Sequence, residues 1–456
     1  VILPKSTVAV VQSTKEKAAD LDYPEIKSMV FEAVEKAGGF KDIIHDGDVV
    51  VLKPNIMCLW IRSTEEMLAP EANGVTVDWR VTKAVVELIR ECNPSGKIYI
   101  IEGAAFQETK IAMDSLNYTH KHIPGVDEFI CLENSGKYEE WDSPKLTKVV
   151  LPEGIGLYPD YMKANKSKEF YMNRKYYEAD VIISMPVLKN HLLTGLTGAV
   201  KNVGIGSSPP NIYGTMEKIT VTSATPASIV SKLKTRIKLE RGRKISHTEY
   251  YLDKWIHDYY LCKPVDFVIT DGLQGLENGP DLNPSVKEKS LKDNQMNMRL
   301  ILAGKDAVAV DAVHSLIMGY DPYKIMHLLH LSSSGVGCMN PRYIRIIGNK
   351  VNDVKKDFEM KVERGAASKY YDFKPPSLSI ESVKRMGNQL HLALSVAPET
   401  AKVEVAIDGK LLDYIILHSY EDITLDISSI KRGNHKLTVY AYDRFLNCSR
   451  QEISID

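Results

Sequence analysis

The sequence predicts an α/β protein with a mostly parallel sheet covered by helices, followed by a C-terminal all-β sandwich. Between Thr7 and Ile347, short apolar runs rich in valine and isoleucine alternate with amphipathic stretches, which is the pattern of strand–helix units. Polar residues directly follow several of these runs. After Lys374-Pro375-Pro376 the pattern changes to short alternating runs separated by turn residues, which is typical of a β-sandwich.

Seven apolar runs have the length and composition of buried strands. They are Thr7–Val11, Asp48–Leu52, Lys97–Ile101, Val181–Ile183, Phe267–Thr270, Arg299–Ala303 and Tyr343–Ile347. Two further candidate strands lie near Phe129 and Val149. Pro54 and Pro186 each follow a run closely, and a proline at that point ends the hydrogen-bonded ladder and turns the chain.

Four stretches have the periodicity of helices. They are Tyr23–Ala37, Asp78–Glu91, Asp306–Met318 and Lys324–Leu331. In the second stretch Val81, Val85 and Ile89 share one apolar face, and Asp78 stands where a helix N-cap belongs. Helices that alternate with strands in this way cover the faces of a mostly parallel sheet.

Length and composition limit the class of protein. The 456 residues exceed one ordinary core and predict two or three domains. A content of 44% hydrophobic and 26% charged residues is typical of soluble globular proteins. The net charge of -1 argues against a general nucleic-acid surface, and no apolar run approaches the roughly 20 residues of a membrane span. The six cysteines are scattered without a CxxC, so no ligands for an iron–sulfur cluster or a zinc ribbon are evident.

The stretch from Val181 to Gly206 carries the strongest indication of a site. After its apolar run it places two lysines, a histidine, two asparagines and four glycines within eighteen residues, from Lys189 to Gly206. Core packing alone does not require this combination. Thr194 and Thr197 precede a short helix whose free N–H groups suit an anion.

Charged and polar residues follow five of the predicted strands. They are Lys53 and Asn55, Glu102, Lys189 and His191, Asp271, and Lys305 and Asp306. In open α/β sheets, ligands bind outside the carboxyl ends of the strands. If the five strands are parallel, these side chains lie on one edge of the sheet and form one binding site.

We therefore expect three groups of site residues. The predicted catalytic residues are Glu102, His191 and Asp271. The predicted anion-binding residues are Lys53, Asn55, Lys189, Thr197, Lys201 and Asn202. The predicted ligands of a divalent metal ion are His191, Asp271 and Asp311, since carboxylate and imidazole groups suit several such ions.

Each assignment has a structural alternative. Glu102 and Asp271, each followed by glycine, could form turns, and His191 could be an ordinary buried histidine. Asp306 occupies an N-cap position. Asp311 lies inside an apolar helix, where an unpaired carboxylate is costly, so a salt bridge to Lys189 or Lys201 would explain it.

Several motifs resemble the domain-of-unknown-function 362 (DUF362) family. They are KPN after an early strand, an E-G strand end, MPVLKNH followed by TGLTGAVKN and a glycine, DG with a later GP, and GKDAVAVDAV. The resemblance runs from Val8 to Gly348, and the KNH-to-KNVG block is its most specific part. It implies an α/β domain with an anion- or metal-competent site, but no reaction. Many members carry a ferredoxin module with CxxC clusters, which this chain lacks, so that association is not transferred.

The expected domains are an α/β domain at residues 1–365, a linker at 366–376 and a β-sandwich at 377–456. Residues 207–263 form a helical insertion, in which a basic run from Lys232 to Lys244 is a solvated helix face or, alternatively, a lid or subunit contact. The segment GNHKLTVYAYDRFLN resembles the final hairpin of bacterial immunoglobulin-like modules. Such modules act as spacers or docking surfaces outside the cytoplasm, which, with the non-Met start, predicts an exported protein.

Three functions remain open on these observations. The first is an enzyme-like domain that binds a small anionic molecule, with a divalent metal ion, at the carboxyl ends of its strands. The second is a non-catalytic binding or assembly protein, with a homo-oligomer or protein partner held through the sandwich. The third is a redox protein that uses a partner's cofactor. No P-loop, GxGxxG, HExxH or GxSxG motif decides between them. Convergence of the predicted residues in one pocket would favour the first.

Overall fold

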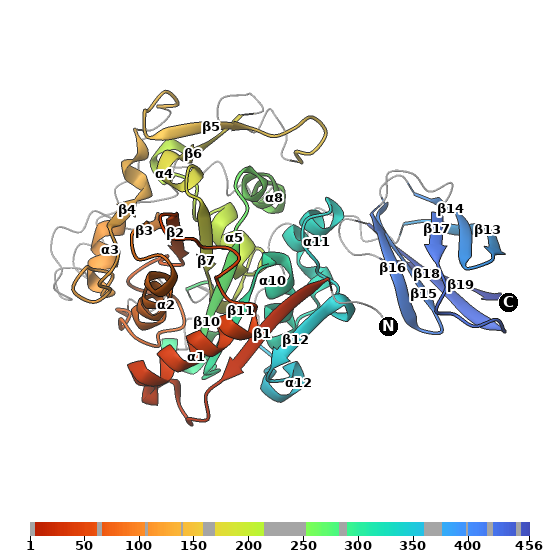
Figure 1. The fold of residues 1–456 in the computed structure, drawn as a ribbon, viewed down its shortest axis with the longest axis horizontal. Coiled ribbons are helices and arrows are strands. Elements are labelled where there is room, and N and C mark those ends of the chain that lie inside the picture. Colours follow the sequence, from red (N-terminus) through yellow and green to blue (C-terminus); the bar gives the residue numbers. More distant parts are fainter. Residues whose placement is uncertain are drawn as a thin grey trace.

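A computed structural model of the 456-residue chain shows an α/β domain and a C-terminal β module (Figure 1). The structure describes residues 5–61, 66–104, 108–137, 140–157, 169–213, 252–281, 290–359, 376–397, 400–416, 423–443 and 448–456. The predicted basic run at 232–244 and most of the predicted linker lie outside these residues.

The α/β domain is built on a sheet of ten strands. Eight of them follow one another in the order β12 (Ile344–Gly348), β1 (Ser6–Gln12), β11 (Leu300–Gly304), β10 (Phe267–Leu276), β7 (Val181–Met185), β2 (Val49–Pro54), β3 (Lys97–Glu102) and β4 (Glu128–Cys131). Neighbouring strands are parallel except around β11, which is antiparallel to both β1 and β10. The predicted α/β class with a mostly parallel sheet is confirmed.

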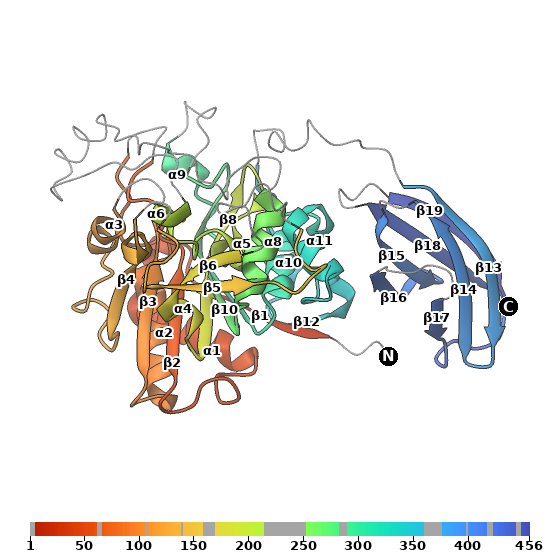
Figure 2. The ribbon, with the colours of Figure 1, turned by 90° about the horizontal axis from the view of Figure 1, so that it is seen from above.

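The sequence forms these strands because both faces of the sheet are covered. Every residue of β7 and β11 is buried, as is expected for apolar, β-branched runs in the middle of a covered sheet. One face packs on α1 (Tyr23–Lys36) and α2 (Trp79–Cys92). The other packs on α5 (Gly198–Gly204), α8 (Leu252–Cys262), α10 (Ala307–Ile317) and α11 (Met326–Ser333). Figures 1 and 2 show the sheet between these two layers.

Three of the predicted helices begin with a side-chain N-cap, and two of these caps, Asp78 and Asp306, were predicted. Asp22 accepts a hydrogen bond from Glu25 N at the start of α1, and Asp78 accepts one from Arg80 N at the start of α2. Asp306 accepts one from Ala309 N at the start of α10. The N-cap interpretation of Asp306 is therefore confirmed, since the side chain satisfies an amide that has no partner inside the helix.

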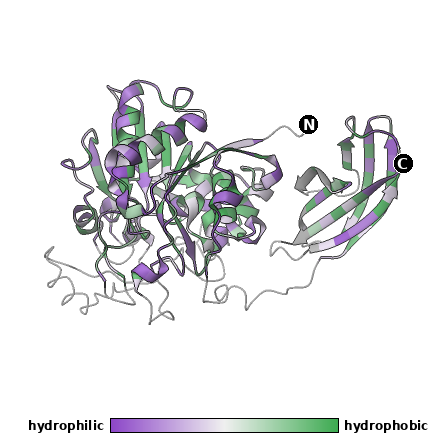
Figure 3. Cartoon of the chain, turned by 90° about the horizontal axis from the view of Figure 1, so that it is seen from below, coloured by the Kyte–Doolittle hydropathy of each residue, from purple (hydrophilic) through white to green (hydrophobic). Residues whose placement is uncertain are grey.

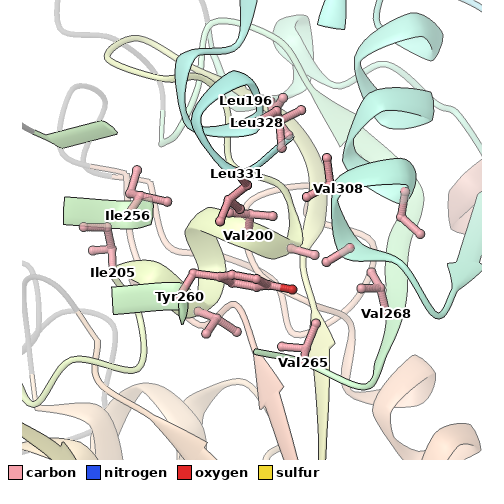
Figure 4. Packing of buried hydrophobic residues seen from close by; sticks show 14 of the residues in the cluster. Leu196, Val200, Ile205, Ile256, Tyr260, Val265, Val268, Val308, Leu328 and Leu331 are labelled. Carbon is pink, nitrogen blue, oxygen red and sulfur yellow. The ribbon is translucent and has the colours of Figure 1, made fainter. Parts of the chain in front are cut away.

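The helices α5, α8 and α11 pack together on the second of these two faces of the sheet (Figure 4). Val200 of α5 lies between Leu328 and Leu331 of α11 on one side and Ile256 of α8 on the other. Trp255 of α8 is fully buried and donates to Gly204 O at 3.1 Å. The aromatic residues of α8 thus pack this segment onto the main domain.

Two details of the sheet differ from the predictions. Pro186 does not end the pairing, because the chain continues as β8 (Val187–His191), which pairs with β10 and with β9 (Gly195–Leu196). In addition, β11 is antiparallel to β10, with Val268 opposite Gly304. The assumption that all five polar strand ends share one edge is therefore wrong for β11, since Lys305 and Asp306 lie at the opposite edge from Asp271.

Smaller elements complete the α/β domain. They are β5 (Leu146–Val150) paired with β6 (Glu169–Asn173), the helices α3 (Thr109–Ser115), α4 (Arg174–Tyr177), α6 (Pro210–Tyr213), α9 (Leu291–Asn294) and α12 (Val351–Val354), and the short 3-10 turns η1 (Ala18–Asp20), η2 (Leu132–Ser135), η5 (Pro322–Lys324) and η6 (Pro341–Tyr343). None of the helices in the described part of the chain is long and apolar enough to cross a membrane.

The C-terminal β module has two antiparallel sheets. One contains β13 (Leu378–Met386), β14 (Gln389–Val396) and β17 (Ile423–Asp426), and the other contains β16 (Lys410–Ile416), β15 (Thr400–Ile407), β18 (His435–Asp443) and β19 (Cys448–Ile455). Alternate residues such as Leu390, Leu392, Val403 and Val405 form its core, and the alternation is visible along the strands in Figure 3. This agrees with the predicted all-β module.

Candidate functional site

A buried ion pair joins the ends of two neighbouring strands. Lys53 at the end of β2 and Glu102 at the end of β3 are 0% and 2% exposed, and Lys53 Nζ lies 2.8 Å from Glu102 Oε1. The carboxylate also accepts hydrogen bonds from Gly103 N at 2.7 Å and Ile56 N at 2.6 Å. Burial lowers the pKa of Lys53, and the charge of Glu102 partly offsets that effect.

Asn202 of α5 reaches across to this pair. Its side-chain amide donates to Lys53 O at 2.8 Å and to Ser184 Oγ at 3.2 Å. Its oxygen accepts from Lys53 Nζ at 3.3 Å and from Asn55 Nδ2 at 3.4 Å. Asn55 Oδ1 is buried and has no hydrogen-bond partner among the described residues. Four of the predicted site residues, Lys53, Asn55, Glu102 and Asn202, therefore form one network.

Lys189 of β8 is a second buried lysine, but its surroundings differ. Its side chain is 0% exposed and donates to Val75 O at 2.5 Å. No carboxylate of the described residues lies within ion-pair distance of its Nζ. Burial lowers its pKa to about 8, and the charges of Cys58, Asp281 and Glu102 raise it only in part. The side chain is thus a buried amine close to Glu102 without a direct anionic partner.

Asp271, within β10, faces another acid. Its Oδ2 accepts from Asp78 N at 2.8 Å and its Oδ1 from Leu273 N at 2.9 Å. Burial, followed by the charge of Asp78, raises the pKa of Asp271 to about 7, and Arg80 lowers it in part. Arg80 itself is paired with Asp78 at 2.7 Å, so Asp271 does not receive that cation directly.

Tyr118 connects these groups electrostatically. Its hydroxyl lies 2.9 Å from Thr82 Oγ1 and donates to Val77 O at 3.0 Å. Burial raises its pKa, and the charges of Asp78, Asp271 and Glu102 raise it further. The three carboxylates therefore act on one phenol.

We call Lys53, Asn55, Glu102, Lys189, Asn202 and Asp271 the strand-end cluster.

His191 and Thr197 lie beside this cluster on the β8–β9 connection. His191 is 5% exposed, lies on the same strand face as Lys189 two residues earlier, and accepts from Leu193 N through Nδ1 at 3.1 Å. Thr197 N donates to Lys189 O at 3.2 Å, whereas Thr197 Oγ1 is buried without a partner in the described part of the chain.

Asp311 and Lys201 belong to a different region. Asp311 of α10 accepts from Ala199 N at 2.7 Å and from Val200 N at 2.9 Å, so its carboxylate occupies the start of α5, where the sequence predicted an anion. Burial raises its pKa to about 7. The charge of Lys201 lowers the pKa of His327 on α11, which places Lys201 toward that helix. Among the described residues, no hydrogen bond or ion pair joins Asp311 to Lys53 or Glu102.

The three predicted metal ligands all accept hydrogen bonds from backbone amides. Both oxygens of Asp271 and both oxygens of Asp311 already accept backbone amides, and His191 Nδ1 accepts another. Across the described ranges, no group of three or more His, Cys, Asp or Glu side chains is arranged to hold a metal ion. We derive no chemical step through a metal.

Sequence patterns missed several members of this environment. Asp78 and Arg80 were expected only as parts of a helix start, and Tyr118 lies in a stretch without clear periodicity. Asn190 also has a positioning role, since its side chain donates to Tyr320 OH and Glu359 O, both at 2.9 Å, and accepts from Gly279 N at 2.6 Å. Its place between Lys189 and His191 was the only sequence signal for it.

Comparison with known proteins identifies the α/β domain. Residues 50–315, more than half of the chain, match the model of a family described as "Domain of unknown function (DUF362)". No curated protein matches the chain. The residues of the strand-end cluster all fall within the matched range.

Solved structures give weak likenesses. The lactate racemase apoprotein from Thermoanaerobacterium thermosaccharolyticum is 12% identical, with a TM-score of 0.31, over 66% of this chain and 54% of that chain. Fibronectin(III)-like modules of Clostridium thermocellum CbhA are 18% identical, with a TM-score of 0.16, over 18% of this chain and 46% of that chain. The chain thus spans about half the length of these structures, and scores this low support no functional argument.

Proposed function

The chain belongs to the DUF362 family, and we propose that its α/β domain binds a small anionic ligand at the strand-end cluster. The ligand would lie outside the carboxyl ends of β2, β3, β8 and β10, where open α/β sheets bind their ligands. The proposal concerns binding first, because Lys189 in this cluster has no ion-pair partner in the described part of the chain.

The observation that carries the proposal is the state of Lys189. A buried ammonium group that makes one hydrogen bond and no ion pair is costly, and burial lowers its pKa to about 8. Val75 O takes one of its three N–H donors. An anionic oxygen at the remaining donors would offset the desolvation of the charge and form charge-assisted hydrogen bonds.

Two neutral polar atoms of this region also lack a hydrogen-bond partner among the described residues. Thr197, whose backbone N donates to Lys189 O, has its side-chain Oγ1 buried in this condition. Asn55 Oδ1, in the network of Lys53, Glu102 and Asn202, is likewise buried without a hydrogen-bond partner among the described residues. Such groups normally find a partner in native proteins, and a ligand with both acceptor and donor groups, such as a hydroxylated carboxylate or a phosphate monoester, would supply one.

Acid–base chemistry by Asp271 is the second candidate function. Its pKa of about 7 is close to the value that suits a group that gives or takes a proton at neutral pH. Glu102 is less suited to this role, because Lys53 and two backbone amides already hold its carboxylate. A carboxyl NMR titration that finds Asp271 near its ordinary pKa of about 3.9 would remove this candidate.

Other expectations remain proposals. A divalent metal ion held by His191, Asp271 and Asp311 is one of these proposals, and elemental analysis of the purified protein tests it. The β module is proposed as a spacer or docking surface of an exported protein. It contacts the α/β domain through Arg342, which donates to Gly409 O at 2.8 Å, and Tyr343, which donates to Leu412 O at 2.9 Å. Cell fractionation tests the location.

The experiment measures anion binding by titration calorimetry at pH 7 with inorganic phosphate, acetate and malonate. We expect the wild-type chain to bind at least one of them and Lys189→Met to bind it at least 10-fold more weakly. Lys305→Met is the matched control. It removes the same charge at the opposite sheet edge, where the Lys305 side chain is exposed and its Nζ lies 3.8 Å from Asp42 Oδ2.

Two outcomes would overturn the proposal. One is that none of the three anions binds the wild-type chain. The other is that Lys189→Met and Lys305→Met weaken binding equally, because that result would indicate general attraction by net charge rather than a site at Lys189.

A further inference from the structure

A second polar group lies away from the strand-end cluster, between α8 and α11. His257 Nδ1 lies 2.7 Å from Asp258 Oδ1, and His257 Nε2 lies 2.7 Å from Ser334 Oγ. Asp258 Oδ1 also accepts from Leu157 N at 2.8 Å. The order carboxylate, imidazole, hydroxyl is the hydrogen-bond order of a Ser-His-Asp triad, which is recognised by geometry rather than by sequence position.

The contacts fix the direction of each hydrogen bond. A carboxylate only accepts, so His257 Nδ1 carries a proton and donates it to Asp258. In the neutral ring Nε2 is then the acceptor, and Ser334 Oγ donates to it. Burial lowers the pKa of His257 below its ordinary value, although Asp258 partly offsets this. The imidazole is thus in the neutral form that takes a proton from serine.

Burial separates the roles of the three residues. His257 and Asp258 are fully buried, whereas Ser334, directly after the last residue of α11, is exposed. The base is therefore held in a fixed position, while the residue that carries the hydroxyl is exposed. In this arrangement a ligand can contact the nucleophile, while the base behind it stays buried.

We propose that Ser334 is a nucleophile that His257 and Asp258 activate, and that it takes acyl groups from carboxylic esters. Ser334 Oγ bonds to the ester carbonyl carbon as its proton passes to His257 Nε2. The bond from that carbon to the alcohol oxygen breaks, and the alcohol leaves with the proton from His257. Water, deprotonated by His257, later releases the acyl group as a carboxylic acid, and the proton returns to Ser334.

The turn around Ser334 limits the rate of this reaction. Gly335 N donates to Ser332 O at 3.1 Å and Val336 N to Leu331 O at 2.9 Å, so neither amide is available to a developing oxyanion. Loss of one such donor typically lowers kcat by about 100- to 1000-fold. Acylation and deacylation both pass through such an oxyanion, so we expect slow turnover, with a burst of one acyl group per chain only for an ester whose good leaving group makes capture faster than release.

A hydroxyl–imidazole bond could also serve only to join the two helices. A neighbouring pair provides a control for that role, because His330 Nε2 of α11 lies 2.6 Å from Asp253 Oδ2 of α8. The rings of His257 and His330 are 6.2 Å apart. A variant that breaks this second pair disturbs the same helix contact without touching Ser334.

The test uses the full chain with a fluorophosphonate and with p-nitrophenyl acetate. With the fluorophosphonate, the phosphorus–fluorine bond breaks, the serine oxygen bonds to phosphorus and the proton passes to His257. We expect one adduct per chain on Ser334 by peptide mass spectrometry, and a burst of about one nitrophenolate. Ser334→Ala should give neither. His257→Gln should slow labelling by at least about 100-fold, while His330→Gln should keep it within about threefold.

Two results would overturn the proposal: no adduct on Ser334 in the folded wild-type chain, or equal labelling rates in His257→Gln and the wild type. Because His257→Gln could fail to fold, Ser334→Cys supplies a second test through its rate of alkylation at that position. A thiol beside His257 should have a pKa below its ordinary value of about 8.5, and an ordinary value would contradict activation.

The pH dependence separates this role from a structural one. The groups that face His257 are Asp258 and Asp253 of its own helix, His330 of α11, and Ser334 directly after α11. Labelling of Ser334 should rise with pH as His257 loses its proton and reach half its maximum below pH 6.5. A rate that instead rises only with hydroxide concentration would show an ordinary serine.

Discussion

The two buried lysines of the strand-end cluster show what makes such a group structural or functional. Lys53 and Lys189 are both 0% exposed and both follow the apolar part of a strand. Lys53 meets Glu102 at 2.8 Å together with Asn202 and a backbone carbonyl. Lys189 meets one backbone carbonyl. A buried charge that is fully paired holds its neighbours in place, whereas a charge that is not paired retains the capacity to bind something else.

The largest effect is expected from variants that remove one partner of the buried Lys53–Glu102 ion pair. Glu102→Gln leaves Lys53 as an uncompensated buried cation, which should reduce the free energy of unfolding by about 3–5 kcal/mol. Lys53→Met leaves the carboxylate without its cation and should have a similar effect. Urea unfolding at pH 7, followed by circular dichroism, measures both.

The double variant Lys53→Met/Glu102→Gln completes the cycle. It buries no net charge, so its loss of stability should be smaller than the sum of the two single losses. Additive losses would mean that the two side chains do not interact energetically, and the contrast with Lys189 would then have no basis.

The second test uses pH to titrate the unpaired lysine. Burial lowers the pKa of Lys189 to about 8 in the folded chain, below its ordinary value of about 10.4. Between these values the unfolded chain binds the extra proton, so stability rises with pH. The contribution is on the order of 3 kcal/mol from pH 8 to pH 10.5, and Lys189→Met should lack it.

Urea unfolding of the two proteins at pH 8 and pH 10 measures this difference, and the groups common to both cancel. Adding an anion that binds Lys189 should raise its pKa and shrink the rise in stability. A rise of equal size in Lys189→Met would show that other lysines or tyrosines cause it.

Two hydroxyl groups in the same region allow the same comparison, between a buried group with partners and one without, for side chains that carry no charge. Thr197 Oγ1 is buried without a partner in the described structure, whereas Ser184 Oγ donates to Ala199 O at 3.1 Å and accepts from Asn202 Nδ2. Ser184→Ala should cost about 1–2 kcal/mol, because it leaves those two groups unpaired. Thr197→Val should cost less than about 0.5 kcal/mol and also weaken anion binding. Thermal unfolding and the anion titration measure the two effects, and equal losses of stability would contradict the pattern.

The comparison also explains how much could be predicted from the sequence. The apolar runs and helix caps predicted most strands and helices because burial and capping act over a few neighbouring residues, as at Asp78 and Asp306. The direction of β11 was not predictable in this way, since an apolar run reads the same for a parallel and an antiparallel strand. That single strand moved Lys305 to the other edge.

Pairing partners were the second limit. The sequence indicated that Asp311 needed a partner, but the partners are the backbone amides of Ala199 and Val200, which no side-chain pattern reveals. Likewise Ser334 and His257 are 77 residues apart and carry no shared motif. A short stretch of sequence shows that a buried charge needs a partner. Which group is that partner depends on contacts between distant segments.

The smallest effect on stability is expected for an exposed ion pair between α1 and α2, which serves as the reference for the buried pair. Lys27 Nζ lies 2.7 Å from Glu87 Oε2, but the two side chains are 39% and 29% exposed. Water and salt screen such a pair, so Lys27→Met should change the free energy of unfolding by less than about 1 kcal/mol. The change should decrease further in 1 M salt, where the Debye length is about 3 Å. Urea unfolding at low and high salt measures it. A loss as large as that of Glu102→Gln would show that distance alone, and not burial, decides what an ion pair contributes in this protein.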